Sequence, residues 1–194
     1  MGGVLTMEAL RQLELEGDGP FWLSQDIVGH PLTAPEASET GIRIRRAWYR
    51  TDGSLFTGDT LTEGESLIAM LTVEANENIP DALVVDLLPG GVEIENLALG
   101  GNEAFGELML DGVKLSEREY GTELRYEEYR DDRYVAALKL WSGSTARLFY
   151  LVRAVSPGQF VVPPPSAEDM YRPQLSGIGS APQKRISVVP PKAR

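Results

Sequence analysis

The sequence predicts an all-β fold, an antiparallel β-sandwich with at most one short helix, over residues 41–194. Segments in which apolar and polar residues alternate recur along this range, and the alternation has the period of a half-buried strand. Two longer apolar runs have the length of buried strands. The 20 glycines and 13 prolines exceed their usual share and fall between these segments as turn residues.

Composition excludes several classes of function. The chain has 194 residues, 42% of them hydrophobic, so it can bury a sizeable core. Its 18 Lys and Arg against 29 Asp and Glu give a net charge of −11, which argues against nucleic acid or an anionic membrane as the main partner. The chain has no Cys, and its one His, His30, lies in a predicted turn. We therefore expect no disulfide, no metal, no cofactor and no catalytic residue. No apolar run reaches the ~18 residues of a membrane-spanning helix, so we expect no membrane-inserted segment.

The first 40 residues are predicted to be separate from the sandwich. Segments 12–16 and 21–25 flank the turn sequence Gly-Asp-Gly-Pro at 17–20, which favours a strand hairpin. Residues 30–40 have the composition of a loop and are interpreted as a linker. The domain boundaries predicted from this pattern are 1–40, the end of a preceding domain with its linker, and 41–194, the sandwich.

The first strand of the sandwich is predicted at 42–49, where Ile42, Ile44, Arg46 and Trp48 share one face. The two longer apolar runs are residues 67–73 and 83–88. Each contains a single polar residue, Thr72 in the first and Asp86 in the second, so both are predicted to be central strands. Pro89-Gly90-Gly91 ends the second run, and a short strand is expected at 92–94.

The middle of the chain is strongly acidic, and we interpret residues 93–133 as a solvated face. A short helix is predicted at 113–119. Asp131 and Asp132 lie between Arg130 and Arg133, which favours a turn tied by ion pairs. Paired carboxylates also leave open a glycosidase-like acid and base or a calcium site, although the spacing of the EF-hand loop is absent.

Three further strands are predicted toward the C-terminus. Segments 134–141 and 147–154 are expected to pair as an antiparallel hairpin, and 158–162 is the next strand. Pro163-Pro164-Pro165 denies three backbone donors to a sheet, so a loop is predicted at 166–181. Alternation returns at 186–189.

The candidate functional residues lie in the predicted loop, in the sequence Asp169-Met170-Tyr171-Arg172-Pro173. Exposed Met and Tyr side by side are unfavourable unless a surface covers them. They are therefore expected either to fold back on this domain or to dock on another one. Met adapts to irregular surfaces and Tyr supplies a large rigid face, which suits a docking role.

Four motifs resemble the C-terminal domain of bacterial alpha-2-macroglobulins. They are the segments 79–96, 129–137 and 148–158, and the triproline followed by Met-Tyr-Arg-Pro at 170–173. The same motifs occur in the same order in that family. The resemblance implies a macroglobulin-like sandwich, similar to a receptor-binding domain, at the end of a much longer chain.

The resemblance also implies a function. Such proteins are broad-spectrum endopeptidase inhibitors that trap a protease after it cuts a bait segment, and many members capture it through a thioester. The terminal domain packs on the thioester domain and shields the bond, and the shielding loop corresponds to Met170, Tyr171 and Arg172. The implied partners are the thioester domain and, through the full-length protein, target proteases. The implied location is the periplasm. A further expectation is that the parent is a lipoprotein anchored to the inner membrane.

Two other hypotheses stay open at this stage. The sandwich is a partner- or receptor-recognition module of the cell envelope, through its acidic face or its basic C-terminal tail, or it is a carbohydrate-active enzyme that uses Asp131 or Asp132. A branch of the resembling family lacks the thioester, and this chain does not contain the position that decides between the branches.

Overall fold

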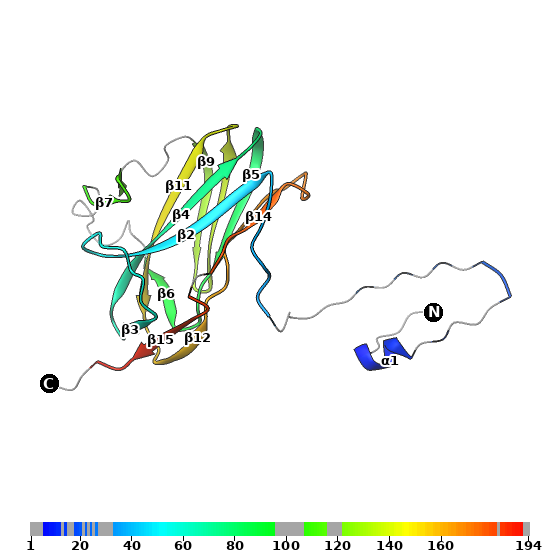
Figure 1. Ribbon diagram of the computed structural model, residues 1–194, viewed down its shortest axis with the longest axis horizontal. Coiled ribbons are helices and arrows are strands. Elements are labelled where there is room, and N and C mark those ends of the chain that lie inside the picture. The colour runs from blue at the N-terminus through cyan, green and yellow to red at the C-terminus, as the bar shows by residue number, and fades with distance from the viewer. Residues whose placement is uncertain are drawn as a thin grey trace. The chain divides into compact units, whose positions relative to one another are not determined.

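Two β-sheets packed face to face form the main body of residues 33–194 (Figure 1). The computed structural model describes residues 6–12, 14, 18–20, 22, 24, 26, 33–95, 107–115, 122–181 and 183–191. The chain divides into two compact units, Met1–Leu32 and Thr33–Arg194. The second unit thus begins within the stretch that the sequence analysis assigned to a linker.

The described residues of the first unit include one short helix, α1 (Met7–Arg11). The Thr6 side-chain oxygen accepts a hydrogen bond from the backbone N–H of Ala9 at 3.2 Å, which is the usual N-terminal cap of a helix. Within the predicted hairpin segments 12–16 and 21–25, the described residues form no strand. The other residues of these segments lie outside the described part of the chain, so the hairpin stays a prediction.

The larger sheet, called sheet A, has the strand order β1-β14-β13-β5-β10-β9, and all its neighbours are antiparallel. Its strands are β1 (Ser38–Thr40), β5 (Ile79–Leu87), β9 (Thr122–Arg130), β10 (Arg133–Leu140), β13 (Ser166–Asp169) and β14 (Ser176–Ile178). Sheet B has the order β2-β4-β11-β6 and is also antiparallel. Its strands are β2 (Ile42–Arg50), β4 (Ser66–Ala75), β6 (Val92–Glu95) and β11 (Thr145–Ala154).

The hydrophobic core lies between sheets A and B. Leu71 and Leu148 from sheet B and Val84 and Leu138 from sheet A are all fully buried in it. The alternation predicted for β2 is confirmed, and Arg46 shares the buried face with its apolar neighbours. The two apolar runs are β4 and β5, and both lie inside their sheets as predicted. The all-β sandwich is therefore confirmed.

Two smaller sheets complete the second unit. Sheet C holds β12 (Gly158–Val161), β15 (Arg185–Val189) and β3 (Thr60–Thr62), with β15 parallel to β3. A further pair, β7 (Met109–Leu110) and β8 (Val113–Lys114), lies beside sheet B (Figure 1). The predicted strands at 92–94, 158–162 and 186–189 are confirmed as β6, β12 and β15. The predicted helix at 113–119 is wrong at its start, where β8 lies, and residues 116–119 are outside the described part of the chain.

The predicted hairpin of segments 134–141 and 147–154 is wrong. These segments are β10 and β11, but β10 pairs with β5 and β9 in sheet A, whereas β11 pairs with β4 and β6 in sheet B. The turn between them crosses from one sheet to the other. Ser142 fixes this crossing, because its backbone N–H donates to Asn78 Oδ1 and its hydroxyl donates to the Asn76 carbonyl, both at 2.8 Å. Alternation shows which face of a strand is buried but not which strand lies beside it.

The loop predicted at 166–181 is also wrong, because it contains β13 and β14. These strands are four and three residues long, too short to show a clear period of two. The triproline takes the chain out of sheet C and delivers it to sheet A, where β13 pairs with β5. The residues 38–40, predicted as linker, form β1 and pair with β14.

Gly177 allows β14 to lie directly against β2 of the other sheet. A Cβ atom at this position would lie 2.4 Å from the carbonyl oxygen of Ile42. No side chain fits at that distance, so the two sheets meet here through their backbones.

Candidate functional site

The Met170–Tyr171 pair is carried on the turn between β13 and β14, drawn in orange in Figure 1. Both side chains are exposed, Met170 by 43% and Tyr171 by 79% of their surface. The predicted alternative that they fold back into this domain is therefore wrong, and the pair is presented to the outside. This turn continues sheet A, so it is not the free loop that the sequence suggested.

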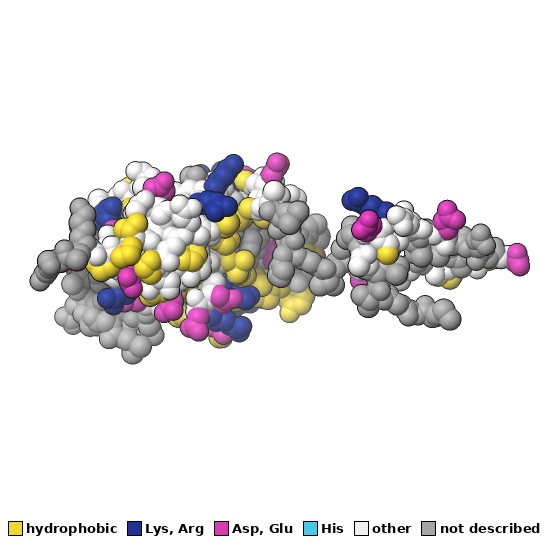
Figure 2. Space-filling view, turned by 90° about the horizontal axis from the view of Figure 1, so that it is seen from below, with side chains coloured by type: hydrophobic (Ala, Val, Ile, Leu, Met, Phe, Trp, Pro, Cys, Tyr) yellow, Lys and Arg dark blue, Asp and Glu magenta, His cyan; other side chains and the backbone are white. Residues whose placement is uncertain are grey.

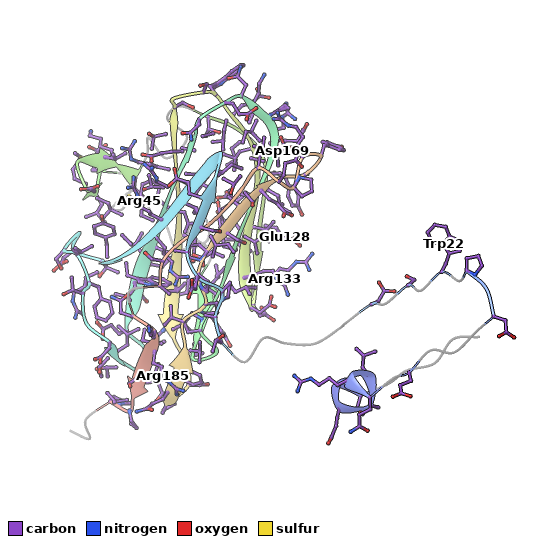
Figure 3. All side chains as sticks on the ribbon, turned by 45° about the vertical axis from the view of Figure 1, so that its right-hand side comes forward. Trp22, Arg45, Glu128, Arg133, Asp169 and Arg185 are labelled. Atoms are coloured by element: carbon purple, nitrogen blue, oxygen red, sulfur yellow. The ribbon has the colours of Figure 1, made fainter. Side chains whose placement is uncertain are left out.

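A buried carboxylate holds the turn in place. Asp169 is only 1% exposed (Figure 3). Its Oδ1 accepts hydrogen bonds from the backbone N–H groups of Tyr171 and Arg172 at 2.9 and 3.0 Å. Its Oδ2 accepts a hydrogen bond from Nε of the Arg172 guanidinium at 2.8 Å and forms an ion pair with Nη2 at 2.7 Å. We call these four interactions the Asp169 clamp. Hydrogen bonds to an ionised carboxylate are among the strongest in proteins, so the turn is rigid.

Arg172 also ties the turn to the connection between β4 and β5. Its Nη1 lies 2.9 Å from Glu77 Oε2, and its Nη2 donates to the Asn78 carbonyl at 3.0 Å. The backbone N–H of Met170 donates to the Asp81 carbonyl at 2.9 Å, which extends the pairing of β13 with β5 by one residue. The Met170–Tyr171 pair thus projects from a turn that is fixed at both ends.

The clamp lowers the pKa of Asp169 below its ordinary value of 3.8. Burial by itself raises this pKa, but the hydrogen bonds from Tyr171 and Arg172 and the charge of the Arg172 guanidinium outweigh burial. A depressed pKa means that the ionised form stabilises the folded state. This contribution is complete above about pH 4 and is lost as the pH falls from there toward the pKa of the folded state.

We expect Asp169→Asn to lower the free energy of unfolding near neutral pH by about 1–3 kcal/mol, because a charged group that accepts three hydrogen bonds and forms an ion pair is replaced. The difference from the wild type should shrink below about pH 4, where the wild-type carboxylate also becomes protonated. Urea unfolding of this chain at pH 6 and pH 3 measures both values. Glu168→Gln, a change at the exposed neighbouring residue, is the matched control. A difference that is equal at the two pH values would contradict a role for the charge.

The arrangement at this turn presents a surface and does not bring reactive groups together. Among the described residues, no group of three or more His, Cys, Asp or Glu is placed to hold a metal ion. In the part of the chain that the structure describes, no helix is long and apolar enough to cross a lipid bilayer.

The paired carboxylates Asp131 and Asp132 form the tight turn between β9 and β10. Arg133 forms the predicted ion pair with Asp132, at 2.6 Å, while Arg130 pairs with Glu128 at 2.8 Å. These ion pairs support the interpretation of this segment as a turn.

The sequence analysis missed a buried charge network between the sheets. Arg46 on β2 and Asp86 on β5 form an ion pair of 2.5 Å, with side chains only 2% and 0% exposed. The hydroxyl of Tyr150 on β11 donates to Asp86 at 2.6 Å, and Arg46 donates to the carbonyl of Pro163 at 2.8 Å. Burial raises the pKa of Asp86, an effect that Arg46 and Tyr150 partly counter. The sequence contained a signal for this network. Arg46 lies on the otherwise apolar face of the predicted strand 42–49, and Asp86 is the one polar residue of the apolar run 83–88.

A family model described as the bacterial alpha-2-macroglobulin MG10 domain matches residues 41–174, which include the Asp169 clamp and most of both sheets. The chain belongs to this family. The chain is 46% identical over 176 residues to alpha-2-macroglobulin of Xylella fastidiosa strain Temecula1, a match that covers 91% of this chain and 11% of the relative. The chain therefore spans about a tenth of the length of the curated relatives it matches.

Solved structures of two relatives are similar to this MG10 domain. Alpha-2-macroglobulin of Escherichia coli in the native conformation aligns with a TM-score of 0.75 and 36% identity, covering 84% of this chain and 10% of that one. Its trypsin-activated form aligns with a TM-score of 0.71 and 34% identity, and the match covers 84% of this chain and 11% of that one. Salmonella alpha-2-macroglobulin reacted with methylamine aligns with a TM-score of 0.71 and 39% identity, and the match covers 84% of this chain and 10% of that one.

Proposed function

We propose that this MG10 domain is the C-terminal domain of a periplasmic broad-spectrum endopeptidase inhibitor, and that it shields the thioester region of the latent parent. The observation that carries the proposal is the exposed Met170–Tyr171 pair on a turn fixed by the Asp169 clamp. The domain acts by contact and not by catalysis. Its partners are the thioester domain and, through the whole parent, target proteases. We also propose that the parent resides in the periplasm and is anchored to the inner membrane as a lipoprotein.

The relatives support a link to proteases and amines. The Escherichia coli relative has a form activated by trypsin, and the Salmonella relative has a form reacted with methylamine. Methylamine is a small nucleophile, and a thioester is opened by such an amine. A reactive bond of this kind survives only while water and amines are excluded from it.

The chemistry of Met170 and Tyr171 suits this exclusion. The flexible thioether of Met fills irregular gaps, and the ring of Tyr covers a large area with a polar tip at its edge. The contact must also open when the parent changes conformation. A contact made by one turn is small, so loss of the facing surface is sufficient to release it.

We expect Tyr171→Ala in the full-length parent to raise the rate at which a labelled small amine is incorporated before any protease is added, because the ring no longer covers the bond. The double change Met170→Ala/Tyr171→Ala should raise it further. In the isolated chain, Tyr171→Ala should leave the thermal midpoint nearly unchanged, because the side chain is 79% exposed.

The matched control is Leu55→Ala, which removes another exposed apolar side chain of this unit. Equal incorporation in the wild type and in both variants would contradict shielding by this turn. If neither the wild-type parent nor its variants are labelled even after proteolysis, the parent belongs to the branch of the family without a thioester. The turn would then be an interdomain contact only.

A further inference from the structure

One edge of sheet A is formed by β1, a strand that precedes the family match. The matched range begins at residue 41, whereas β1 spans Ser38–Thr40. β1 pairs with β14, so the strand that follows the Met170–Tyr171 turn lies between β13 on one side and β1 on the other. The residues directly before the matched domain therefore contribute a strand to the sheet that carries the turn.

The hydrogen bonds at the base of the turn show which residues of β14 bond to β13. The Leu175 carbonyl accepts from the Asp169 N–H at 3.0 Å, and the Gly179 N–H donates to the Pro165 carbonyl at 2.8 Å. Opposite residues in an antiparallel pair are alternately hydrogen-bonded and not hydrogen-bonded. Residues 175, 177 and 179 therefore direct their backbone groups to β13, and residues 176 and 178 direct theirs to β1.

This alternation distinguishes two neighbouring residues of β1. Ser38 lies opposite Ile178, and Glu39 lies opposite Gly177. Since the backbone groups of Ile178 face β1, the Ser38 N–H bonds to β14. The Glu39 N–H points away from β14, because Gly177 bonds to β13.

Gly41 joins β1 to β2 and contacts the base of the turn. Its φ of 80° lies in the left-handed region, which glycine adopts without strain. A Cβ atom at this position would lie 2.9 Å from Cδ2 of Leu175. Leu175 closes the Met170–Tyr171 turn, because its carbonyl accepts from Asp169 and its N–H donates to the Arg172 carbonyl at 2.8 Å. The end of β1 is thus in contact with the residue on which the turn closes.

A second set of contacts connects Gly41 to the same turn through residues 76–78, between β4 and β5. The Asn76 N–H donates to the Gly41 carbonyl at 3.0 Å. The next two residues bind Arg172, Glu77 by an ion pair and Asn78 through its carbonyl. Arg172 belongs to the Asp169 clamp. A displacement of Gly41 therefore reaches the clamp by two routes.

β1 itself is held weakly. Its three residues are all exposed, and among the described strands it pairs with β14 alone. Glu39 forms an ion pair with Arg43 at 2.7 Å, but the side chains are 37% and 50% exposed, so the pair contributes little. Figure 2 shows acidic and basic side chains grouped in the same way on one face of the domain. Segments with few buried contacts open locally while the rest of a structure stays folded.

We propose that β1 is a strap that couples the chain before the domain to the Met170–Tyr171 turn. When residues 33–37 are pulled away, β1 leaves β14, Gly41 moves off Leu175, and the turn loses part of its support. Any movement that favours the detached strap loosens the turn. The chain spans only 11% of the length of its Xylella relative, and other parts of such a long parent would exert the pull. The effect on a thioester rests on the proposed function, because a loosened turn would no longer exclude amines.

Amide hydrogen exchange in the isolated chain, followed by NMR, tests the strap. Ser38→Pro removes the N–H that bonds to β14, so the N–H groups of Asp169 and Leu175 should exchange several-fold faster than in the wild type. Glu39→Pro is the matched control, because it places the same ring one residue further on and removes an N–H that points away from β14. It should leave both rates nearly unchanged. Leu71 in the central strand β4 reports on unfolding of the whole domain and should exchange at its wild-type rate in both variants.

Three results would overturn the strap. Unchanged exchange at Leu175 in Ser38→Pro would show that β1 does not support the turn. Equal acceleration by Glu39→Pro would show that pairing with β14 is not the cause. Equal acceleration at Leu71 would show that the whole domain, and not the turn, has been destabilised.

The full-length parent separates this proposal from the proposed function. Ser38→Pro should raise amine incorporation before any protease is added, and Glu39→Pro should not. If Tyr171→Ala speeds incorporation but Ser38→Pro does not loosen the turn, shielding stands and the strap fails. If Ser38→Pro loosens the turn but neither variant changes incorporation, the strap stands and thioester shielding fails. If Ser38→Pro loosens the turn and only Tyr171→Ala speeds incorporation, the coupling of the strap to the thioester is overturned.

Discussion

Arg46→Met should destabilise the isolated chain by about 3–5 kcal/mol, because it leaves the buried carboxylate of Asp86 without its charge partner. Both side chains are almost completely inaccessible to solvent, at 2% and 0% exposure. Domains are stable by about 5–15 kcal/mol in total, so this change removes a large part of the stability. Urea unfolding followed by tryptophan fluorescence measures the loss.

A double variant separates the ion pair from the packing. Arg46→Met/Asp86→Leu removes both charges and keeps most of the volume, so it should recover much of the stability lost in Arg46→Met. The hydroxyl of Tyr150 then loses its acceptor, so the recovery will not be complete. If the double variant is less stable than Arg46→Met, the ion pair is not the source of the effect.

The second large effect is expected for Val84→Asp, which should prevent the chain from folding at ordinary temperature. Val84 is fully buried in the core on the central strand β5, and an unpaired carboxylate there has no partner within the apolar cluster. Val85→Asp is the matched control, because Val85 is the next residue on the same strand and lies on the outward face. Val85→Asp should therefore lower the free energy of unfolding much less than Val84→Asp does.

Circular dichroism and thermal melting of the two variants give the comparison directly. From the sequence alone, the apolar run 83–88 predicted that Val85→Asp would unfold the chain by burying an unpaired charge, but the structure places Val85 on the partly exposed outward face of β5. Equal loss of structure in both variants would mean that the outward face of sheet A is also part of a packed core.

The sequence predicted the long strands β2, β4 and β5 and the short strands β6, β12 and β15, but not the long strand β9. β2 alternates between buried and more exposed residues from Ile42 to Trp48, and β4 and β5 contain nearly continuous apolar runs. Such patterns indicate which residues of a strand are buried, and the structure confirms the predicted burial in these strands. The fold class followed from these strands together with the Gly and Pro residues between them.

Strand pairing could not be predicted in the same way. β10 and β11 are neighbours in sequence with a short connection, which favours a hairpin, yet tertiary packing places them in different sheets. β13 and β14 are too short to carry a signal of their own. They form because β13 pairs with one edge of β5 and β14 pairs with β13. Contacts between distant residues leave little trace in a single sequence.

The candidate site was predicted in part. The pattern of exposed apolar residues identified Met170 and Tyr171, and the structure shows both exposed. The role of Asp169 was missed, although an Asp three residues before an Arg is a spacing that allows a turn to close on itself.

The pairing of β13 with β5 also sets the order in which the domain can be completed during synthesis. Ser166 lies beside Val85, a separation of 81 residues along the chain. One edge of β5 therefore stays unpaired until residues 166–169 have left the ribosome. Open apolar edges invite pairing with other chains, and topologies with such distant contacts fold slowly. A nascent chain of this domain thus keeps an open edge on β5 until residues 166–169 have emerged, and a chaperone would protect it at this stage.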